Sequence, residues 1–279
     1  LYATGYVSDA IVHFERDTFD GTLTQKKTTK DPATLNGLSK LVVSSDGKNV
    51  YAAAATSDAI VTFDRNTVSG ALSNLRSLTD SSLNGVYSLT LSSQGKHAYA
   101  VATQSDSVLH FTRDPSNGDL THVGSPIIDS TNMDKPYQVT TSPDGRNLLV
   151  AVEDSHSLIQ FDIDASTGGL SRQVNLRDAN NLNQAQDVIV SPDGKYIYVA
   201  AHTSKSVVKF DRIIPCKANE RVLGHECVQC PAGKWNEPGD DAMRDDTKCN
   251  LVSKGNVTLQ NQVNLNDATN LNTVHAVAV

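Results

Sequence analysis

Apolar and polar positions recur along this chain in units of nearly constant length. In each unit a run that is apolar nearly throughout, such as Tyr196 to Ala201, precedes a segment in which apolar and variable positions alternate. The first kind of run is typical of a strand covered on both faces, and the second of a strand with one buried and one wet face. A Gly-containing turn then leads to a ragged outer strand, so we expect burial to fall from the innermost strand outward.

The alternating segment of every unit keeps one phenylalanine while the residue before it varies. The phenylalanines follow one another at intervals of 49, 48, 50 and 49: Phe14, Phe63, Phe111, Phe161 and Phe210. The preceding positions, which we assign to the wet face, are His13, Thr62, His110, Gln160 and Lys209. A fixed period near 50 indicates an array in which no unit can bury its apolar face alone. The sequence therefore predicts an all-β fold, a β-propeller of four-stranded blades.

Five blades are visible in the sequence. Residues 1–30 supply the last three strands of one blade, residues 38–80, 86–129 and 136–178 supply complete blades, and a further blade begins near Ala185. The motif of Gln173 to Asp178 returns as Gln262 to Asp267, an offset of 89 where the period is 49. An insert of 40 residues therefore precedes that outer strand. We divide the chain into blades over 1–212, a cysteine-rich insert over 213–254 and a return to the propeller over 255–279.

The segment Val274 to Val279 has the pattern of another innermost strand, and it leaves two closures open. It can complete the first blade by pairing with Tyr2 to Thr4, which gives a ring of five blades. Alternatively the chain is one part of a larger ring or of a tandem array, and we favour this second arrangement. Propellers have about 4 to 8 blades, so both counts are acceptable.

Charge and composition exclude two classes of partner. The chain has 279 residues, a formal net charge of -7 and no basic run that could neutralise phosphates, so we expect no nucleic-acid binding. No segment approaches about 18 consecutive apolar residues, so we expect no membrane insertion. We also predict no cofactor.

The motif Ser191-Pro-Asp-Gly-Lys-Tyr-Ile-Tyr-Val-Ala-Ala, followed by Val207-Val-Lys-Phe-Asp211, resembles the YVTN and lactonase-type propeller repeat, which includes 6-phosphogluconolactonase-like proteins. The resemblance covers roughly residues 1–212 and 255–279. It implies a propeller, usually of seven blades, in a family that ranges from lactonases of cyclised sugars to surface-layer and adhesive proteins.

The four cysteines lie within 34 residues of the insert: Cys216, Cys227, Cys230 and Cys249. An even count in a Gly/Pro/Asp-rich segment indicates two disulfides, with three possible connectivities. A zinc site with His225 is the alternative. The sequence Cys227-Val-Gln-Cys230-Pro-Ala-Gly resembles the cysteine-rich modules of ephrin-receptor and TNF-receptor type, and this resemblance implies pairing of Cys216 with Cys227 and of Cys230 with Cys249. Together with the sequon at Asn256, the cysteines favour an extracellular, glycosylated protein.

Two columns of polar residues are candidates for chemistry. The links between blades repeat an aspartate and an apolar residue, and we expect the aspartate to cap a turn while the apolar residue fills the gap between blades. A ring of calcium-binding carboxylates is the alternative. The aspartates are Asp31, Asp80, Asp129, Asp178 and Asp267, and the apolar residues are Leu35, Leu83, Met133, Leu182 and Leu271.

The second column lies in the loops between the second and third strands of the blades. Its members are Asp9, Asp58, Asp106, His156 and Lys205. Glu153 and His202 precede the last two, and with Asp154, His156 and Lys205 they can form a polar cluster for acid–base catalysis. Solvated loop tips are the alternative.

Two functions follow from these observations. We favour a non-enzymatic extracellular module for structure or adhesion, part of a larger surface or filament-forming protein of mastigoneme or surface-layer style. Its partners would be proteins or glycans at the cell surface, with self-association or a tandem array. The alternative is a secreted lactonase-like hydrolase that acts on a sugar lactone through Glu153, His156 and His202.

Overall fold

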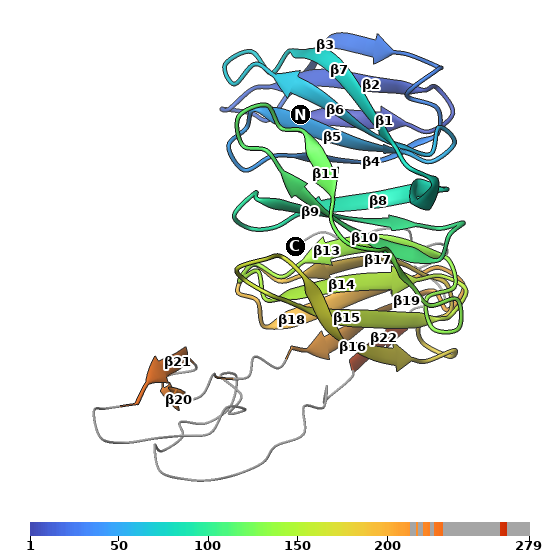
Figure 1. Ribbon diagram of the computed structural model, residues 1–279, viewed down its shortest axis with the longest axis vertical. Coiled ribbons are helices and arrows are strands. Elements are labelled where there is room, and N and C mark those ends of the chain that lie inside the picture. Colours follow the sequence, from blue (N-terminus) through green and yellow to red (C-terminus); the bar gives the residue numbers. More distant parts are fainter. Residues whose placement is uncertain (213–215, 217–219, 224–225, 231–262, 267–279) are drawn as a thin grey trace.

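The computed structural model describes residues 1–212, 216, 220–223, 226–230 and 263–266. It is an all-β structure, and its sheets succeed one another as the blades of a β-propeller (Figure 1). The first sheet contains β1 (Tyr2–Gly5), β2 (Ala10–Arg16) and β3 (Leu23–Lys30). The second contains β4 (Leu38–Val43), β5 (Asn49–Ala54), β6 (Ala59–Arg65) and β7 (Leu72–Thr79).

The third sheet contains β8 (Val86–Leu91), β9 (His97–Ala102), β10 (Ser107–Arg113), β11 (Leu120–His122) and β12 (Ile127–Ile128). Its outer strand is split in two because Gly124, at a φ of 71°, and Pro126 interrupt the pairing. The fourth sheet contains β13 (Pro136–Thr141), β14 (Asn147–Val152), β15 (Ser157–Ile163) and β16 (Leu170–Arg177). A three-residue 3-10 helix, η1 (Ser81–Leu83), links the second and third sheets.

The fifth sheet contains β17 (Ala185–Val190), β18 (Tyr196–Ala201), β19 (Ser206–Asp211) and β22 (Val263–Asn266). Val263 pairs with Lys209 as Val174 pairs with Gln160 in the fourth sheet, so β22 takes the outer-strand register that the 89-residue offset predicts. Within the insert, β20 (Glu220–Leu223) and β21 (Glu226–Gln229) form a hairpin. The segment Val274 to Val279, and with it the closure of the ring, lies outside the described residues.

Burial differs from the expected order in one respect. The second strand of each complete blade is the most buried, and all six residues of β5 and of β14 are buried. The innermost strands β4, β8 and β13 have mixed burial because one side of them faces the axis of the propeller. The side that we assigned to solvent is also covered: Thr62, His110 and Gln160 are buried because it lies against the next blade. His110 is therefore not a wet strand position.

Apolar clusters join each blade to the next. One of them combines Tyr51 and Ile60 of the second sheet with Leu89 and Phe111 of the third. The apolar residues of the links between blades, Leu35, Leu83, Met133 and Leu182, are fully buried, so they fill the gaps as predicted. Leu271 lies outside the described residues. The part of the chain that the structure describes has no helix of the length and apolarity needed to cross a bilayer.

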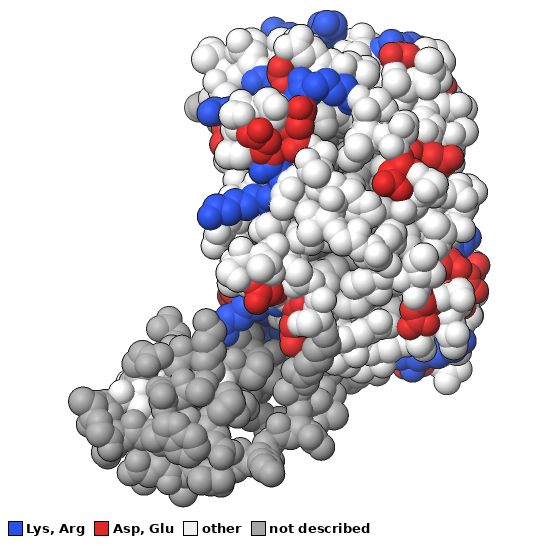
Figure 2. Space-filling view, viewed as in Figure 1, with Lys and Arg blue, Asp and Glu red and all other residues white. Residues whose placement is uncertain are grey.

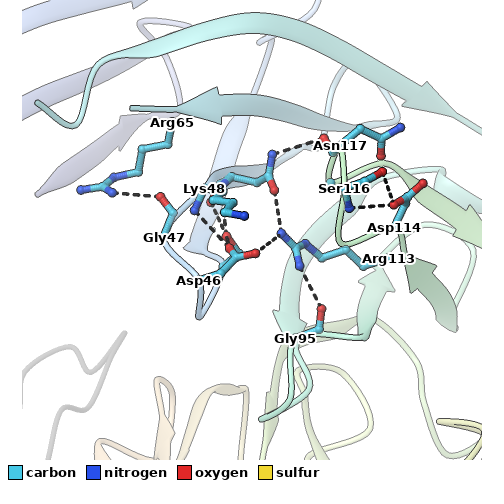
Figure 3. Close-up of polar contacts among 12 residues, drawn as sticks. Asp46, Gly47, Lys48, Arg65, Gly95, Arg113, Asp114, Ser116 and Asn117 are labelled. Atoms are coloured by element: carbon cyan, nitrogen blue, oxygen red, sulfur yellow. Dashed lines mark hydrogen bonds and ion pairs between the residues drawn. The ribbon is translucent and has the colours of Figure 1, made fainter. Parts of the chain in front are cut away.

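A buried arginine also joins the second and third blades (Figure 3). The guanidinium of Arg113 donates to Asp46 Oδ2 at 2.9 Å, to Asn49 Oδ1 at 2.7 Å and to the hydroxyl of Tyr51 at 2.7 Å, all in the preceding blade. It also donates to the carbonyl oxygen of Gly95 in its own blade at 3.3 Å. Arg212 repeats this arrangement against Asp144. We call such an arginine–aspartate contact a clasp.

Candidate functional site

A β-bulge occurs near the start of each innermost strand from the second to the fifth sheet. The pairing register shifts by one residue there, for example between Leu38 and Lys40 in β4. The bulged residues are Ser39, Tyr87, Tyr137 and Gln186. Bulges redirect side chains and are frequent beside active sites. Here they place four side chains at the axis of the propeller, because the innermost strands of successive blades contact one another.

These side chains line a groove of about 330 Å³, which we call the axial groove. Four innermost strands contribute to it, and its lining residues are Ser39, Lys40, Tyr87, Tyr137, Gln138, Gln186 and Asp187. The volume is within the range of about 300–1,000 Å³ that is usual for small-molecule sites. The groove therefore combines an ammonium, a carboxylate, two phenols and two amides on one surface.

Two tyrosines form one wall of the axial groove. The hydroxyl oxygens of Tyr87 and Tyr137 lie 2.6 Å apart, and their ring centroids lie 4.2 Å apart. Burial and the contact with Tyr87 raise the pKa of Tyr137 well above its usual value. The phenol of Tyr137 therefore keeps its proton at neutral pH. Since one hydroxyl donates to the other, one O–H remains for a ligand in the groove.

The floor of the groove is polar and largely buried. Ser88 Oγ donates to Gln138 Oε1 at 2.7 Å, and it accepts a hydrogen bond from the backbone N–H of Val139 at 3.3 Å. Asp187 is 6% exposed and its Oδ1 accepts from the backbone N–H of Val188 at 3.0 Å. The two bonds at Ser88 hold the side chain of Gln138 in one orientation, as a preorganised site requires.

Glu153 lies behind the groove and connects to it through Gln186. Gln186 Nε2 donates to Glu153 Oε1 at 3.4 Å, and Lys135 Nζ lies 3.0 Å from Glu153 Oε2. Burial opposes the charge of Lys135, but the ion pair with Glu153 outweighs it and raises the pKa of that ammonium. Glu153 is itself 5% exposed. It therefore holds its two neighbours in place from a position outside the groove lining.

His156 takes part in a link between blades. Its Nδ1 lies 2.9 Å from the carbonyl oxygen of Glu153 and 3.3 Å from the backbone nitrogen of Gln184 in the next blade. In earlier blades the aspartates of the same column accept from the equivalent N–H, as Asp58 does from Gly85 at 2.7 Å. All five members of this column have a φ between 48° and 52°. All members of the column except Lys205 therefore connect one blade to the next among the described residues, a role that the sequence analysis missed.

His202 joins the same group through Gln184. Its Nδ1 lies 3.0 Å from Gln184 Oε1, which also accepts from the hydroxyl of Thr203. The structure thus brings Glu153, His156 and His202 into one chain of polar contacts. Asp154 and Lys205 of the predicted cluster take part through the backbone: the N–H of Asp154 donates to Asp134 and that of Lys205 to His202.

Two residues that begin blades also adopt a positive φ. Gly37 and Gly85 begin the second and third blades with φ values of 71° and 68°. The equivalent residues of the fourth and fifth blades are Lys135 and Gln184, with φ values of 60° and 56°. Non-glycine residues in this region cost on the order of 1 kcal/mol each and cluster at functional sites. Lys135 contacts Glu153, and Gln184 contacts His202.

The aspartates of the links each cap their own turn. Asp80 Oδ1 accepts from the backbone N–H of Ser82 at 2.8 Å, and Asp178 Oδ1 accepts from that of Asn180 at 3.0 Å. Asp31 and Asp129 make the same kind of contact. No group of three or more potential metal ligands occurs in the residues that the structure describes. Asp267 lies outside them, so the calcium ring is not assembled from the four aspartates that can be placed.

The insert is described only in part. Neither Cys216 nor Cys230 carries a free thiol. The pairing partners, including Cys249, and the sequon at Asn256 lie outside the described residues or have undescribed side chains. The disulfide connectivity and the glycosylation therefore stay predictions, as does the zinc alternative with His225.

The chain folds as a β-propeller with a polar groove at its axis. The sequence matches the family model "Lactonase, 7-bladed beta-propeller" over residues 1–128 and 84–181. The chain therefore belongs to this lactonase family of seven-bladed β-propellers. The match ends before the insert, and nothing in the comparisons supports the receptor-type resemblance of the cysteine-rich segment.

Several solved structures are similar to this chain. A candidate 6-phosphogluconolactonase from Bacteroides uniformis has 22% identity and a TM-score of 0.67, over 76% of this chain and 63% of that one. The periplasmic gluconolactonase PpgL of Pseudomonas aeruginosa has 19% identity and a TM-score of 0.62, over 85% of this chain and 66% of that one. No curated protein matches the sequence. The chain thus spans somewhat less than two thirds of the length of these two structures.

Proposed function

We propose that this protein is a lactonase-like hydrolase that opens a sugar lactone in the axial groove. The observation that carries the proposal is the set of four β-bulges, which converge polar side chains from four blades on one groove. Membership of the lactonase family and the gluconolactonases among similar structures support it. The non-enzymatic module that we favoured from the sequence has no comparable support.

Hydrolysis of a lactone needs two things from the protein, a group that transfers protons and donors that stabilise an oxyanion. Water adds to the carbonyl carbon, the bond from that carbon to the ring oxygen breaks, one proton leaves the water and one reaches the ring oxygen. A carboxylate must accept and return the proton, and donors must stabilise the negative oxygen of the tetrahedral intermediate. The groove offers a carboxylate in Asp187 and donors in Lys40 and the tyrosine pair.

We assign the proton transfer to Asp187 and the stabilisation of the oxyanion to Lys40 and Tyr137. The high pKa of Tyr137 suits this role, because the phenol keeps its proton and donates it in a hydrogen bond. Gln138 and Gln186 can bind sugar hydroxyls with both the donor and the acceptor of their amides. Glu153 is then a positioning residue that acts through Gln186, and His202 supports it from the next blade. The proposed site of action is outside the cytoplasm, in line with the periplasmic location in the name of one similar structure.

The test is turnover of glucono-δ-lactone, measured as acid release above the spontaneous rate, with its 6-phosphate as a second substrate. We expect Asp187→Asn to lower kcat about a hundredfold or more, since a general base contributes about 10²–10⁴. Asp20→Asn, in an exposed turn of the first blade, serves as the control and should retain full activity. Absence of turnover by the parent protein, or full turnover by Asp187→Asn, contradicts the proposal.

A further inference from the structure

A second cavity lies far from the axis, at the outer seam between the first and second blades. It has a volume of about 320 Å³ and is lined by residues of β2, β3 and the turn before β7. The lining residues are Ile11, His13, Glu15, Lys26, Lys27, Thr29, Ser69, Ala71 and Leu72. None of them lines the axial groove. We call this cavity the seam pocket.

The next seam shows why this pocket exists. Between the second and third blades the equivalent space is occupied by Arg76 and by Leu78, which packs against the apolar cluster. The strand pairing makes Lys27 the counterpart of Arg76 and Thr29 the counterpart of Leu78. Two smaller side chains thus leave a hollow where the next seam is filled.

Basic and acidic side chains lie interspersed over the face of the molecule in Figure 2, and the charges of the two seams differ. Arg76 lies between two carboxylates, with Nη2 2.8 Å from Asp64 Oδ1 and Nε 2.8 Å from Asp119 Oδ1. The turn that carries Asp119 in the third blade carries Ala71 in the second. The first seam therefore lacks the carboxylate that the next blade supplies to its cation.

One cation of the seam pocket is left without a counter-ion. Lys26 forms an ion pair with Glu15 at 2.5 Å. Glu15 is the acidic residue among those that line the pocket. Burial lowers the pKa of His13, whose ring stacks on Tyr2 with centroids 5.1 Å apart, so the charged form of His13 is disfavoured. Lys27 has no ion pair within the part of the chain that the structure describes.

The opposite wall of the pocket is apolar. Ile11 is 1% exposed and Leu72 is 8% exposed, and both belong to one apolar cluster. An apolar wall that faces a lone ammonium suits a ligand with an alkyl body and one anionic end. Such an anion would occupy the place that Asp119 takes in the next seam.

We propose that the seam pocket binds a small amphipathic carboxylate, whose carboxylate pairs with Lys27 and whose alkyl chain packs on Ile11 and Leu72. This site is separate from the axial groove, so it neither requires nor affects lactone hydrolysis. The ligand class follows from the missing acid at position 71 and the missing leucine at position 29.

The experiment titrates the protein with octanoate and, as the uncharged control, with 1-octanol, using calorimetry. We expect octanoate to bind and Lys27→Gln to weaken its binding about tenfold, which is the loss of one charged hydrogen bond of about 1.5 kcal/mol. Lys30→Gln, an exposed lysine of the same strand outside the pocket, should leave the affinity unchanged. Octanoate binding that is unaffected by Lys27→Gln, or equal binding of 1-octanol, overturns the proposal.

Two further variants introduce into the seam pocket the residues that the next seam carries at the same positions. Thr29→Leu should abolish octanoate binding by filling the hollow, and Ala71→Asp should weaken it by giving Lys27 its own carboxylate. Each variant should keep the melting temperature of the parent or raise it, which excludes misfolding as the cause. Octanoate binding that persists in Thr29→Leu overturns the assignment to this pocket.

Discussion

Two neighbouring seams of the propeller are held together by different side chains. The seam between the second and third blades has the clasp of Arg113 and Asp46. The next seam has Ile163 and Gln94 at the equivalent positions, so both partners of the clasp are absent together. There Ile163 packs against the apolar cluster that contains Tyr99, and the ring of Tyr99 stacks on that of His110.

In this comparison both residues of the clasp are replaced together. A single buried arginine without its carboxylate would be an uncompensated charge, which costs more than the loss of the pair. Burial opposes the charge of Asp46, but the bonds from Ser44, Lys48 and Arg113 outweigh it and lower its pKa to about 2. These two seams are therefore one clasped and one apolar, and we expect a seam that keeps only Arg113 of the clasp to be less stable than either.

The largest expected loss of stability comes from truncating the buried phenylalanine that each of the two seams contains. Phe111 is 0% exposed in the clasped seam, and Phe161 is 2% exposed in the apolar one. Phe111→Ala and Phe161→Ala should each lower the free energy of unfolding by about 4 kcal/mol, because each leaves a cavity in a packed cluster. Urea denaturation measures both. A much smaller loss for either phenylalanine would mean that its seam is not held by apolar packing.

The second largest loss of stability is expected for breaking the clasp. Arg113→Ala should cost about 3 kcal/mol, because Asp46, Asn49 and Tyr51 all lose a partner. The double variant Asp46→Gln/Arg113→Ile, which copies the next seam, should cost less than the single variant. A double-mutant cycle in urea checks this. Additive losses would show that the two residues do not act as a unit.

The two seams should also respond to different pH ranges. Burial, with repulsion from His97 and His122, lowers the pKa of His110 to about 4, so folding favours the neutral ring. The stability that folding gains from the neutral ring is full above the unfolded pKa near 6.5, and about 3 kcal/mol of it is lost as pH falls toward 4. Asp46 contributes fully above its unfolded value of 3.8, and that contribution is lost only as pH falls toward 2.

Thermal melts at pH 7, 5.5 and 4 measure the histidine effect. His110→Gln uses the residue that the fourth blade carries at this position, Gln160, and should flatten the pH dependence between 6.5 and 4. A slope that is unchanged in this variant would assign the effect to another group.

The smallest effect is expected for an exposed ion pair. Lys26 and Glu15 pair at the first seam with side chains that are 47% and 63% exposed, whereas Arg113 is 3% exposed. Lys26→Gln should not change the melting temperature measurably, since exposed pairs contribute little. A clear drop in the melting temperature would show that burial does not explain why the clasp stabilises the protein more than the exposed pair does.

Much of the fold could be predicted because it follows from repetition. The period of the phenylalanines located the blades, and the offset of 89 located the outer strand of the fifth blade, which β22 forms. The buried face at Thr62, His110 and Gln160 was assigned wrongly because polar residues there contact the next blade, and a pattern within one blade does not show this.

The site was harder to predict than the fold. Glu153, His156 and His202 are brought together, but the axial groove was missed because β-bulges at Ser39, Tyr87, Tyr137 and Gln186 break the alternation of the strands. The two clasps could have been found, since Arg113 and Arg212 each follow the phenylalanine of their blade by two residues.

The most direct test of the central claim is a crystal structure of the protein soaked with gluconate, the open product of glucono-δ-lactone. The account predicts density for gluconate in the axial groove, in contact with Tyr137 and Asp187, and none there in crystals soaked with an unrelated polyol. Gluconate bound elsewhere, or an empty groove in a protein that hydrolyses the lactone, would contradict it.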